Sequence, residues 1–208
     1  MFYFVKRPWW LKKIYGTCTW QINTAEKIIY LSFDDGPHPI ATPFVLAVLK
    51  KYNAKATFFC IGKNVAAWPA IYQQIIDDGH TVGNHTYDHL NGWKTDKEAY
   101  LQNIQKAQKL IGSSLYRPPY GKITFKQIRD LLTQPKPLKI IMWSVLSADF
   151  DKGISNDKCV ENVIKNTGKG SIVVFHDSEK AFEKLQFTLP KILAHFEKSG
   201  FKYQKIGL

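Results

Sequence analysis

The stretch IIYLSFDDGPHPIATPFVLAVLKKY, residues 28–52, contains one complete βα unit. Its first part, Ile28–Phe33, is a short β-branched and aromatic run that is typical of a strand, and Thr42–Tyr52 has apolar residues at the three- and four-residue spacing of an amphipathic helix. Two adjacent acids and two chain-breaking residues separate these parts. The same order of short apolar run, polar turn and longer amphipathic stretch recurs along the chain, which predicts an α/β fold with a parallel sheet.

The other expected strands share this short apolar pattern and lie at Ala56–Ile61, Thr81–Asn84, Leu115–Arg117, Lys139–Trp143, Ser171–Phe175 and Lys202–Ile206. The other expected helices share the amphipathic spacing and lie at Val65–Asp77, Lys97–Ile111, Asn156–Lys165 and Phe182–Ser199. Thr95 and Asp96 are suitable N-caps, and Gly79 and Gly200 are suitable helix stops. Because the carboxyl ends of parallel strands meet at one face, we expect the functional groups there.

The composition is that of one ordinary globular domain. The chain has 208 residues, of which 45% are hydrophobic and 22% charged, and it shows no internal repeat, linker or low-complexity tract. Its formal net charge of +12 favours contact with an anionic partner such as an acidic polymer, a membrane surface or nucleic acid. The lysines are spread along the chain without a basic run interleaved with aromatics, so nucleic acid is not expected as a partner.

The N-terminal segment is basic and aromatic. Lys6, Arg7 and Pro8 interrupt its apolar residues, which leaves no signal-peptide core, and no later stretch has the roughly 18 apolar residues that a membrane span needs. By sequence we therefore expect a cytoplasmic protein, although a cell-envelope substrate would require export. The segment's aromatic residues either pack on the domain, which we favour, or make peripheral contact with a membrane surface: Phe2, Tyr3, Phe4, Trp9 and Trp10.

The cysteines do not point to a metal or disulfide site. Cys18, Cys60 and Cys159 are widely spaced and odd in number, and they include no CxxC pair. We expect structural or free thiols.

The turn after the first strand places Asp34 and Asp35 side by side. Successive strand residues point to opposite faces, so both acids can serve one site only if the backbone bends, and Gly36 permits a bend. Asp-Gly is also common in turns, and Asp caps helices. Taken alone, the motif indicates turn chemistry and a functional site about equally.

The segment NHTYDH, residues 84–89, holds two imidazoles four residues apart, a spacing that puts both on one side of a helical turn. Two neutral imidazoles and one carboxylate bind a divalent metal while leaving positions open for water and substrate. We predict His85 and His89 as ligands, with Asp35 as the third. His38 and His80 are competing candidates without a partner at such a spacing.

The segment YRPPYG, residues 116–121, is a rigid turn that leaves Arg117 at a strand end. An arginine there can orient a carboxylate through a bidentate fork, and a free backbone N–H after the prolines can face a developing oxyanion. A surface salt bridge of Arg117 is the alternative.

The apolar run SIVVF, residues 171–175, ends in His176, which places a titratable ring at the same face as the metal cluster. A carboxylate such as Asp149 beside the ring would raise its pKa and keep it protonated as a general acid. Helix capping together with Asp177 is the alternative role for His176.

Taken in order, SFDDG, HTYDH, RPPYG, the Asp149-Phe150 segment and IVVFH resemble the five motifs of the polysaccharide deacetylases, also called carbohydrate esterase family 4 or the NodB-homology domain. The resemblance covers roughly Lys27 to Leu208. It divides the chain into an N-terminal extension, 1–26, packed on the domain, and a deacetylase domain, 27–208.

The resemblance implies a distorted (β/α) barrel in which Asp35, His85 and His89 bind a divalent metal, most simply zinc, with cobalt, nickel or manganese as alternatives. It implies catalytic roles as follows: Asp34 is the general base, Arg117 orients Asp34, the Tyr120 N–H stabilises the oxyanion, and Asp149 tunes His176 as general acid. Aromatic residues expected along a sugar-binding groove are Tyr87, Trp93, Tyr120 and Phe150. The oligomeric state is not indicated.

One motif departs from the family pattern. The fourth commonly reads Asp-x-x-Asp-Trp, whereas here Leu146 stands at the first acid and Phe150 at the tryptophan. Phe150 can still wall a groove, but Leu146 removes a polar partner. The departure bears on substrate preference.

The implied function is metal-dependent removal of N-acetyl groups from a polysaccharide or oligosaccharide that contains N-acetylglucosamine, such as peptidoglycan or chitooligosaccharide. Two alternatives are kept. The scaffold could bind carbohydrate without catalysis, or the two histidines and one carboxylate could form the iron site of an oxygenase.

Overall fold

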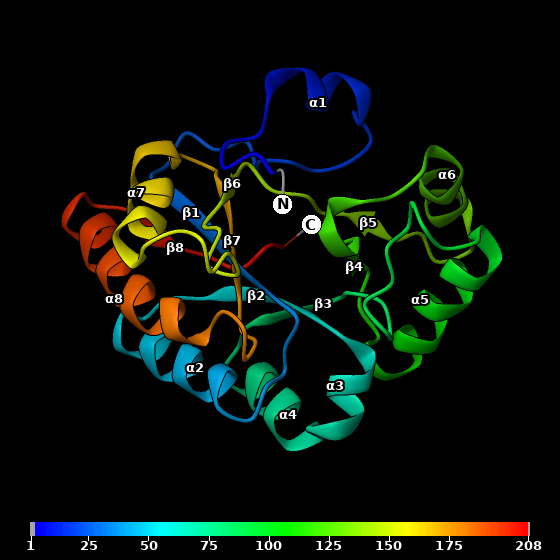
Figure 1. Cartoon of the computed structure of the whole chain (residues 1–208), viewed down its shortest axis with the longest axis horizontal. Coiled ribbons are helices and arrows are strands. Elements are labelled where there is room, and N and C mark those ends of the chain that lie inside the picture. Colours follow the sequence, from blue (N-terminus) through cyan, green and yellow to red (C-terminus); the bar gives the residue numbers. More distant parts are fainter. Residues whose placement is uncertain (1–2, 208) are drawn as a thin grey trace.

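The computed structural model describes residues 3–207. Its strands form one parallel sheet in the order β5-β4-β3-β2-β1-β7-β6, and β8 pairs with β1 off this path. The sheet curls so that strands far apart in its order face each other across the molecule (Figure 1). The strand bounds are β1 Ile28–Asp34, β2 Ala56–Cys60, β3 Thr81–Asn84, β4 Leu115–Tyr116, β5 Lys139–Ile140, β6 Val145–Leu146, β7 Ile172–His176 and β8 Lys202–Tyr203.

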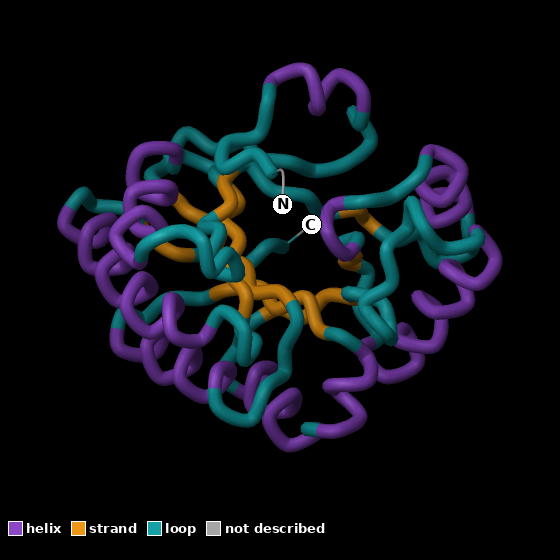
Figure 2. The backbone as a smooth tube through the Cα atoms, viewed as in Figure 1, coloured by secondary structure: helices purple, strands orange, loops and turns teal. Residues whose placement is uncertain are grey.

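Most of the helices lie outside the curled sheet, as Figure 2 shows by colour. Their bounds are α1 Trp9–Ile14, α2 Ala41–Lys51, α3 Gly62–Ala67, α4 Pro69–Asp77, α5 Lys97–Ile111, the 3₁₀ helix η1 Pro119–Gly121, α6 Phe125–Thr133, α7 Asn156–Asn166 and α8 Phe182–Lys198. A curled parallel sheet inside a layer of helices confirms the predicted distorted (β/α) barrel.

The central strands are buried on both faces. All seven residues of β1 are buried, which explains why its sequence is an almost unbroken apolar run rather than an alternating one. Phe33 of β1 stacks on Phe58 of β2 and Phe175 of β7, with ring centroids 5.1 and 5.8 Å apart. Fully burying one such side chain contributes about 1.5–3 kcal/mol, so this layer fixes how β1, β2 and β7 sit together.

Local chemistry explains where the expected elements differ from the structure. The single helix expected at Val65–Asp77 is two helices, α3 and α4, which meet at Trp68 because Pro69 favours a helix start over a helix interior. The strand expected at Lys139–Trp143 ends at Ile140. Strand β6 and helices α1 and α6 were not predicted. Two residues of strand and six of helix show too little periodicity to recognise, whereas α6 is clearly amphipathic and starts with a Thr124–Gln127 capping box that the sequence analysis overlooked.

The helix ends behave as expected at α5. The Asp96 side chain accepts hydrogen bonds from the backbone N–H groups of Glu98 and Ala99, which makes it the N-cap. Gly79 and Gly200 follow α4 and α8 with φ of 79° and 76°, a left-handed conformation that favours glycine.

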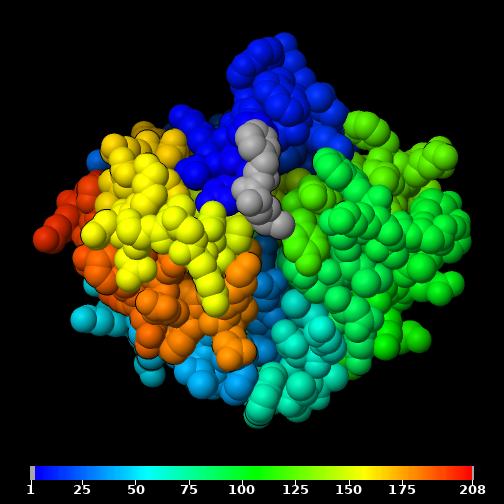
Figure 3. All heavy atoms as spheres, in the orientation of Figure 1, coloured from blue at the N-terminus to red at the C-terminus, as the bar shows by residue number. Residues whose placement is uncertain are grey.

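The N-terminal segment pairs with both edges of the sheet. Lys6 forms an antiparallel bridge with Val145 in β6, and Thr19 forms a parallel bridge with Ile141, directly after β5. The segment, which forms the blue region at the top of Figure 3, therefore joins the two edge strands of the sheet. Trp20, which follows, is buried. The division of the chain at residue 26 stays a prediction.

Within residues 3–207, none of the helices combines the length and apolar character that a bilayer crossing requires. The three cysteines are buried and free, as expected.

Candidate active site

The polar motifs lie where the strands end. Asp34 is the last residue of β1, and strand register pairs it with His176, the last residue of β7. On the other side of β1, the sheet continues to β3, which ends at Asn84 directly before His85. Arg117 directly follows β4. The sheet therefore brings Asp34, His85, Arg117 and His176 together at the carboxyl ends of its strands.

The backbone bend that separates the two acids lies at Asp35, not at Gly36 as the sequence suggested. Asp35 has φ of 84°, a left-handed conformation that costs a non-glycine residue free energy. The Asp35 carbonyl accepts a hydrogen bond from Asn64 Nδ2 at 2.7 Å, and the Asp35 N–H donates to the Phe59 carbonyl at 3.3 Å. These contacts hold the strained turn, which directs the Asp34 and Asp35 side chains to different neighbours.

Gly36 is required for another reason, its contact with Asp177. A Cβ on Gly36 would lie 2.1 Å from Asp177 Oδ2, and the Gly36 N–H donates to Asp177 Oδ1 at 3.1 Å. Thr42 Oγ1 donates to the other carboxylate oxygen at 2.5 Å. Burial raises the pKa of Asp177 to about 8. Asp177 thus braces the turn after the two acids, a role that the sequence did not reveal because its partners lie some 140 residues away.

Three side chains could hold a metal ion. One ligand atom each from Asp35, His85 and His89 lies within 4.8 Å of the others. Asp35 Oδ1 is 3.8 Å from His85 Nε2 and 3.3 Å from His89 Nε2, yet this buried oxygen has no hydrogen-bond partner among the described residues. A buried carboxylate oxygen without a partner is costly, and a cation coordinated by all three atoms would remove that cost. The donor set therefore fits a divalent metal.

The two imidazoles do not lie on a helical turn, contrary to the sequence-based reasoning. Residues 85–90 form no helix, and Thr86 and His89 have φ of 65° and 58°. The rings nevertheless lie 5.1 Å apart between centroids. His85 Nδ1 lies 2.8 Å from the Arg117 carbonyl, which can only accept, so the proton is on Nδ1. The lone pair of Nε2 is then free to coordinate a metal.

Burial keeps both imidazoles neutral. Burial, and then the neighbouring His89 ring, hold the pKa of His85 well below its ordinary value. Burial also lowers the pKa of His89, although the nearby Asp35 and Asp34 oppose the shift. A neutral imidazole is the form that coordinates a metal.

Arg117 is fully buried rather than on the surface. Its Nη1 donates to Asp34 Oδ1 at 2.7 Å and to Ser32 Oγ at 2.8 Å, and its other nitrogens donate to the backbone carbonyls of Ile141 and Met142. The contact with Asp34 is single-ended, so the expected bidentate fork does not form. Burial lowers the pKa of Arg117, and the Asp34 charge opposes this shift.

His176 forms a close pair with Asp149. The carboxylate lies 2.7 Å from His176 Nδ1 through Oδ1, and its Oδ2 accepts the His176 backbone N–H at 2.7 Å. Burial disfavours the charged imidazole, but the charge and hydrogen bond of Asp149 raise the pKa of His176 to about 9. The ring is therefore protonated near neutral pH, and Nε2 is left for a substrate.

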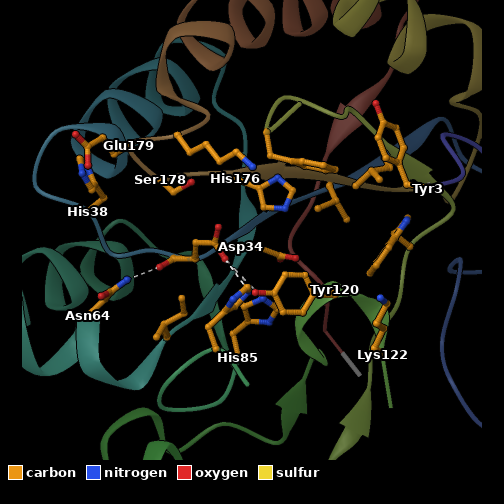
Figure 4. A pocket seen from close by; sticks show the side chains of 18 of the residues that line it. Tyr3, Asp34, His38, Asn64, His85, Tyr120, Lys122, His176, Ser178 and Glu179 are labelled. Carbon is orange, nitrogen blue, oxygen red and sulfur yellow. Dashed lines mark hydrogen bonds and ion pairs between the residues drawn. The ribbon is translucent and has the colours of Figure 1, made fainter. Parts of the chain in front are cut away.

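These groups open into one cavity of about 550 Å³, a size that suits a small ligand or part of a polymer. Figure 4 shows Asp34, His85, Tyr120 and His176 around its centre. The Tyr120 ring lies 4.6 Å from that of His89, and its backbone has φ of 61°.

Two of the four aromatic residues expected in the groove lie along this cavity, Tyr120 and Phe150. Leu146, at the position where the family pattern has an acid, also lines it. Tyr87 and Trp93 do not: Tyr87 packs under Lys106 Nζ at 3.6 Å from its ring centroid, and Trp93 Nε1 donates to the Ile123 carbonyl.

The competing histidines have other partners. His38 lines the cavity, but its Nδ1 accepts the backbone N–H groups of Ile40 and Ala41 at the start of α2. His80 Nδ1 accepts the Ala56 N–H, and burial lowers its pKa to about 4. Neither belongs to the three-residue donor cluster within residues 3–207.

Comparison with known proteins gives a consistent result. The family model described as polysaccharide deacetylase matches residues 21–134. Two peptidoglycan-N-acetylglucosamine deacetylases of Bacillus cereus are 36% and 34% identical to the chain, covering 81% and 92% of it. The chain spans 62% of the first relative and 92% of the second. The crystal structure of the Bc1960 peptidoglycan N-acetylglucosamine deacetylase superimposes with a TM-score of 0.86 at 30% identity, covering 96% of this chain and 95% of that one.

Proposed function

Because the chain belongs to the polysaccharide deacetylase family, we propose that it hydrolyses the amide of N-acetylglucosamine units in a glycan, either peptidoglycan or a chitooligosaccharide, and releases acetate. It is thus a hydrolase of carbon–nitrogen bonds. The observation that carries the proposal is the meeting of a three-donor metal cluster, a buried carboxylate and a protonated imidazole in one cavity.

Asp35, His85 and His89 would hold the metal. Two imidazole nitrogens and one carboxylate oxygen suit zinc first, with cobalt, nickel or manganese as alternatives, and they leave positions open. When bound, the ion polarises the acetyl carbonyl and lowers the pKa of a coordinated water.

Asp34 acts as the general base that takes a proton from the attacking water. Its Oδ1 is tied to Arg117 at 2.7 Å, so the arginine fixes the orientation of the carboxylate. The Arg117 guanidinium is itself held by Ser32 and two backbone carbonyls. The base is therefore set before the substrate arrives.

His176 acts as the general acid that gives a proton to the departing nitrogen. Asp149 holds Nδ1, so Nε2 is the atom that delivers the proton. The Tyr120 N–H donates toward the acetyl oxygen as its negative charge develops. Acetate and a free amine leave. An iron oxygenase would use neither the Asp34–Arg117 pair nor the Asp149–His176 pair.

The direct test is release of acetate from a panel of acetylated glycans, with and without a chelator. We expect release from peptidoglycan or chitooligosaccharides, loss of release with chelator, and recovery when zinc is added. Retention of the glycan without any acetate would instead support the non-catalytic carbohydrate-binding alternative, and turnover that requires iron and oxygen would support the oxygenase.

We expect Asp149→Asn to lower the pH at which activity is lost. His176 must be charged to act as an acid, and its raised pKa of about 9 keeps it charged up to alkaline pH. Removing a charge in direct contact shifts a pKa by roughly one to three units, so the alkaline limb of kcat/KM moves down by about that amount. The measurement is kcat/KM for acetate release from pH 5 to 10.

A matched control is Asp157→Asn, which removes a carboxylate that is 87% exposed on α7. Its alkaline limb should coincide with that of the wild type. An unchanged limb in the Asp149→Asn protein would rule out the proposed tuning of His176.

A further inference from the structure

One wall of the cavity comes from the N-terminal segment. Tyr3 lines the cavity together with Phe150 and His176, although it lies about 30 residues before the first motif of the site. Figure 4 shows Tyr3 on one side of His176 and His38 and Asn64 on the other. The family model begins at residue 21, so Tyr3 lies outside the matched region.

Backbone pairing holds this segment against the strand that leads into the site. The Leu146 N–H donates to the Val5 carbonyl at 2.8 Å, and the Arg7 N–H donates to the Ser144 carbonyl at 3.0 Å. These two hydrogen bonds, one on each side of the bridge between residues 6 and 145, fix the register of the segment. The pairing thus positions Tyr3 at the wall of the cavity.

The Tyr3 side chain is fixed at both its hydroxyl and its ring. The hydroxyl donates to Asp151 Oδ2 at 2.6 Å, and the ring packs edge-on against Phe150, with centroids 5.4 Å apart and planes at 69°. Phe150 in turn packs edge-on against His176 at 5.1 Å. The ring nevertheless stays partly exposed in the cavity, so it can contact a ligand.

Tyr3 is not suited to move protons. Burial and the hydrogen bond to Asp151 raise its pKa to about 12, so the phenol stays neutral, and its hydroxyl proton is already engaged. What remains available is an immobilised aromatic surface. A sugar ring offers an apolar face that packs on such a surface at little entropic cost, because the aromatic ring is held beforehand.

We propose that Tyr3 is a specificity-determining residue, whose ring forms the wall of a subsite for the sugar unit next to the one that is deacetylated. The proposal rests on the proposed function in that the bound polymer is the acetylated glycan. Lys122, which lines the same side of the cavity in Figure 4, can donate to the hydroxyl or acetyl oxygens of that sugar. The segment before the deacetylase motifs then helps to choose the substrate.

The experiment compares Tyr3→Ala, Tyr3→Phe and wild type on two substrates. The first is the pentamer of N-acetylglucosamine, and the second is 4-nitrophenyl acetate, which carries an acetyl group and no sugar. We expect Tyr3→Ala to raise KM for the pentamer roughly five- to tenfold with kcat nearly unchanged, the loss of one aromatic contact. Activity on 4-nitrophenyl acetate stays the same, and Tyr3→Phe, which keeps the ring, recovers most of the pentamer KM.

Trp9→Ala is the matched control, because it removes an aromatic side chain from the same segment that is 70% exposed and does not line the cavity. Equal loss of activity on both substrates would mean that Tyr3 only braces the 144–151 segment, and unchanged KM in Tyr3→Ala would mean that it contacts no sugar. Either result overturns the proposal.

A binding measurement separates this proposal from the proposed function. Calorimetry of the pentamer with zinc-loaded Asp34→Asn protein, with and without Tyr3→Ala, should show a five- to tenfold weaker Kd for the double variant. If the wild type released no acetate but Tyr3→Ala weakened binding, the subsite would stand and the deacetylase proposal would fail. If the wild type released acetate and Kd did not change, the deacetylase proposal would stand and the Tyr3 subsite would fail.

Discussion

The Asp34→Asn protein is expected to bind zinc as the wild type does and to release acetate about 10²–10⁴-fold more slowly, the usual contribution of a general base. The substitution keeps the shape of the side chain and an oxygen that can accept the hydrogen bond from Arg117. It removes the group that takes the proton from water. The metal donors, Asp35, His85 and His89, are untouched.

Two measurements decide this prediction: the zinc content and zinc affinity of the purified protein, and kcat/KM for acetate release. Because Arg117 is fully buried, its lost ionic partner costs stability, and unfolding in denaturant must show that the variant is folded at the assay temperature. Wild-type activity in a folded Asp34→Asn protein would exclude Asp34 as the base.

The His85→Ala protein is expected to lose both the metal and the activity. His85 supplies one of the three donor atoms and is almost fully buried, so its removal leaves two donors around a cavity. Changes of residues that only support a ligand reduce metal affinity about 10–100-fold, and removal of a ligand should exceed this. Acetate release should fall to background at zinc concentrations that saturate the wild type.

Thermal unfolding gives an independent measurement. An ion that binds only the folded state stabilises it by RT ln(1 + [L]/Kd), so zinc should raise the Tm of the wild type and leave that of His85→Ala unchanged. His195→Ala, an exposed histidine on α8, is the control and should respond to zinc like the wild type. A zinc-dependent rise in the Tm of His85→Ala would place the metal elsewhere.

The order of strands and helices was predictable because each is encoded by neighbouring residues. A fully buried parallel strand such as β1 leaves an apolar run, and an amphipathic helix such as α5 leaves a three- and four-residue spacing. Polar residues directly after such runs, as at Asp34 and His176, follow from the same argument. The catalytic roles of the residues at the strand ends remain predictions from the family resemblance.

The backbone of the site was less predictable, because it departs from regular structure. The bend at Asp35 and the left-handed residues Thr86 and His89 are conformations that sequence rarely indicates outside glycine. They are held by contacts such as that from Asn64 to the Asp35 carbonyl. A spacing argument based on a helical turn therefore reached the two imidazoles by the wrong geometry.

Contacts between distant residues were predictable only where the family resemblance supplied them, as for Arg117 with Asp34 and Asp149 with His176. Asp177 meets Gly36 and Thr42, and Tyr3 meets Asp151, over sequence separations of 135 to 148 residues. No local pattern marks such pairs in a single sequence. The lack of room for a Cβ at Gly36 appears only in the structure.

The pairing of residues 6 and 19 with the two edges of the sheet has a consequence for how the molecule assembles. An uncovered edge strand offers unpaired N–H and C=O groups to any other extended chain, and here both edges are covered by residues that precede the edge strands by more than 100 positions in the sequence. Residues 6 and 19 can pair only after residues 141–146 have been synthesised. Until then, the edges of the partly formed sheet are uncovered. Self-association should be greatest at that stage, and a chaperone that shields β-edges would raise the yield of native protein.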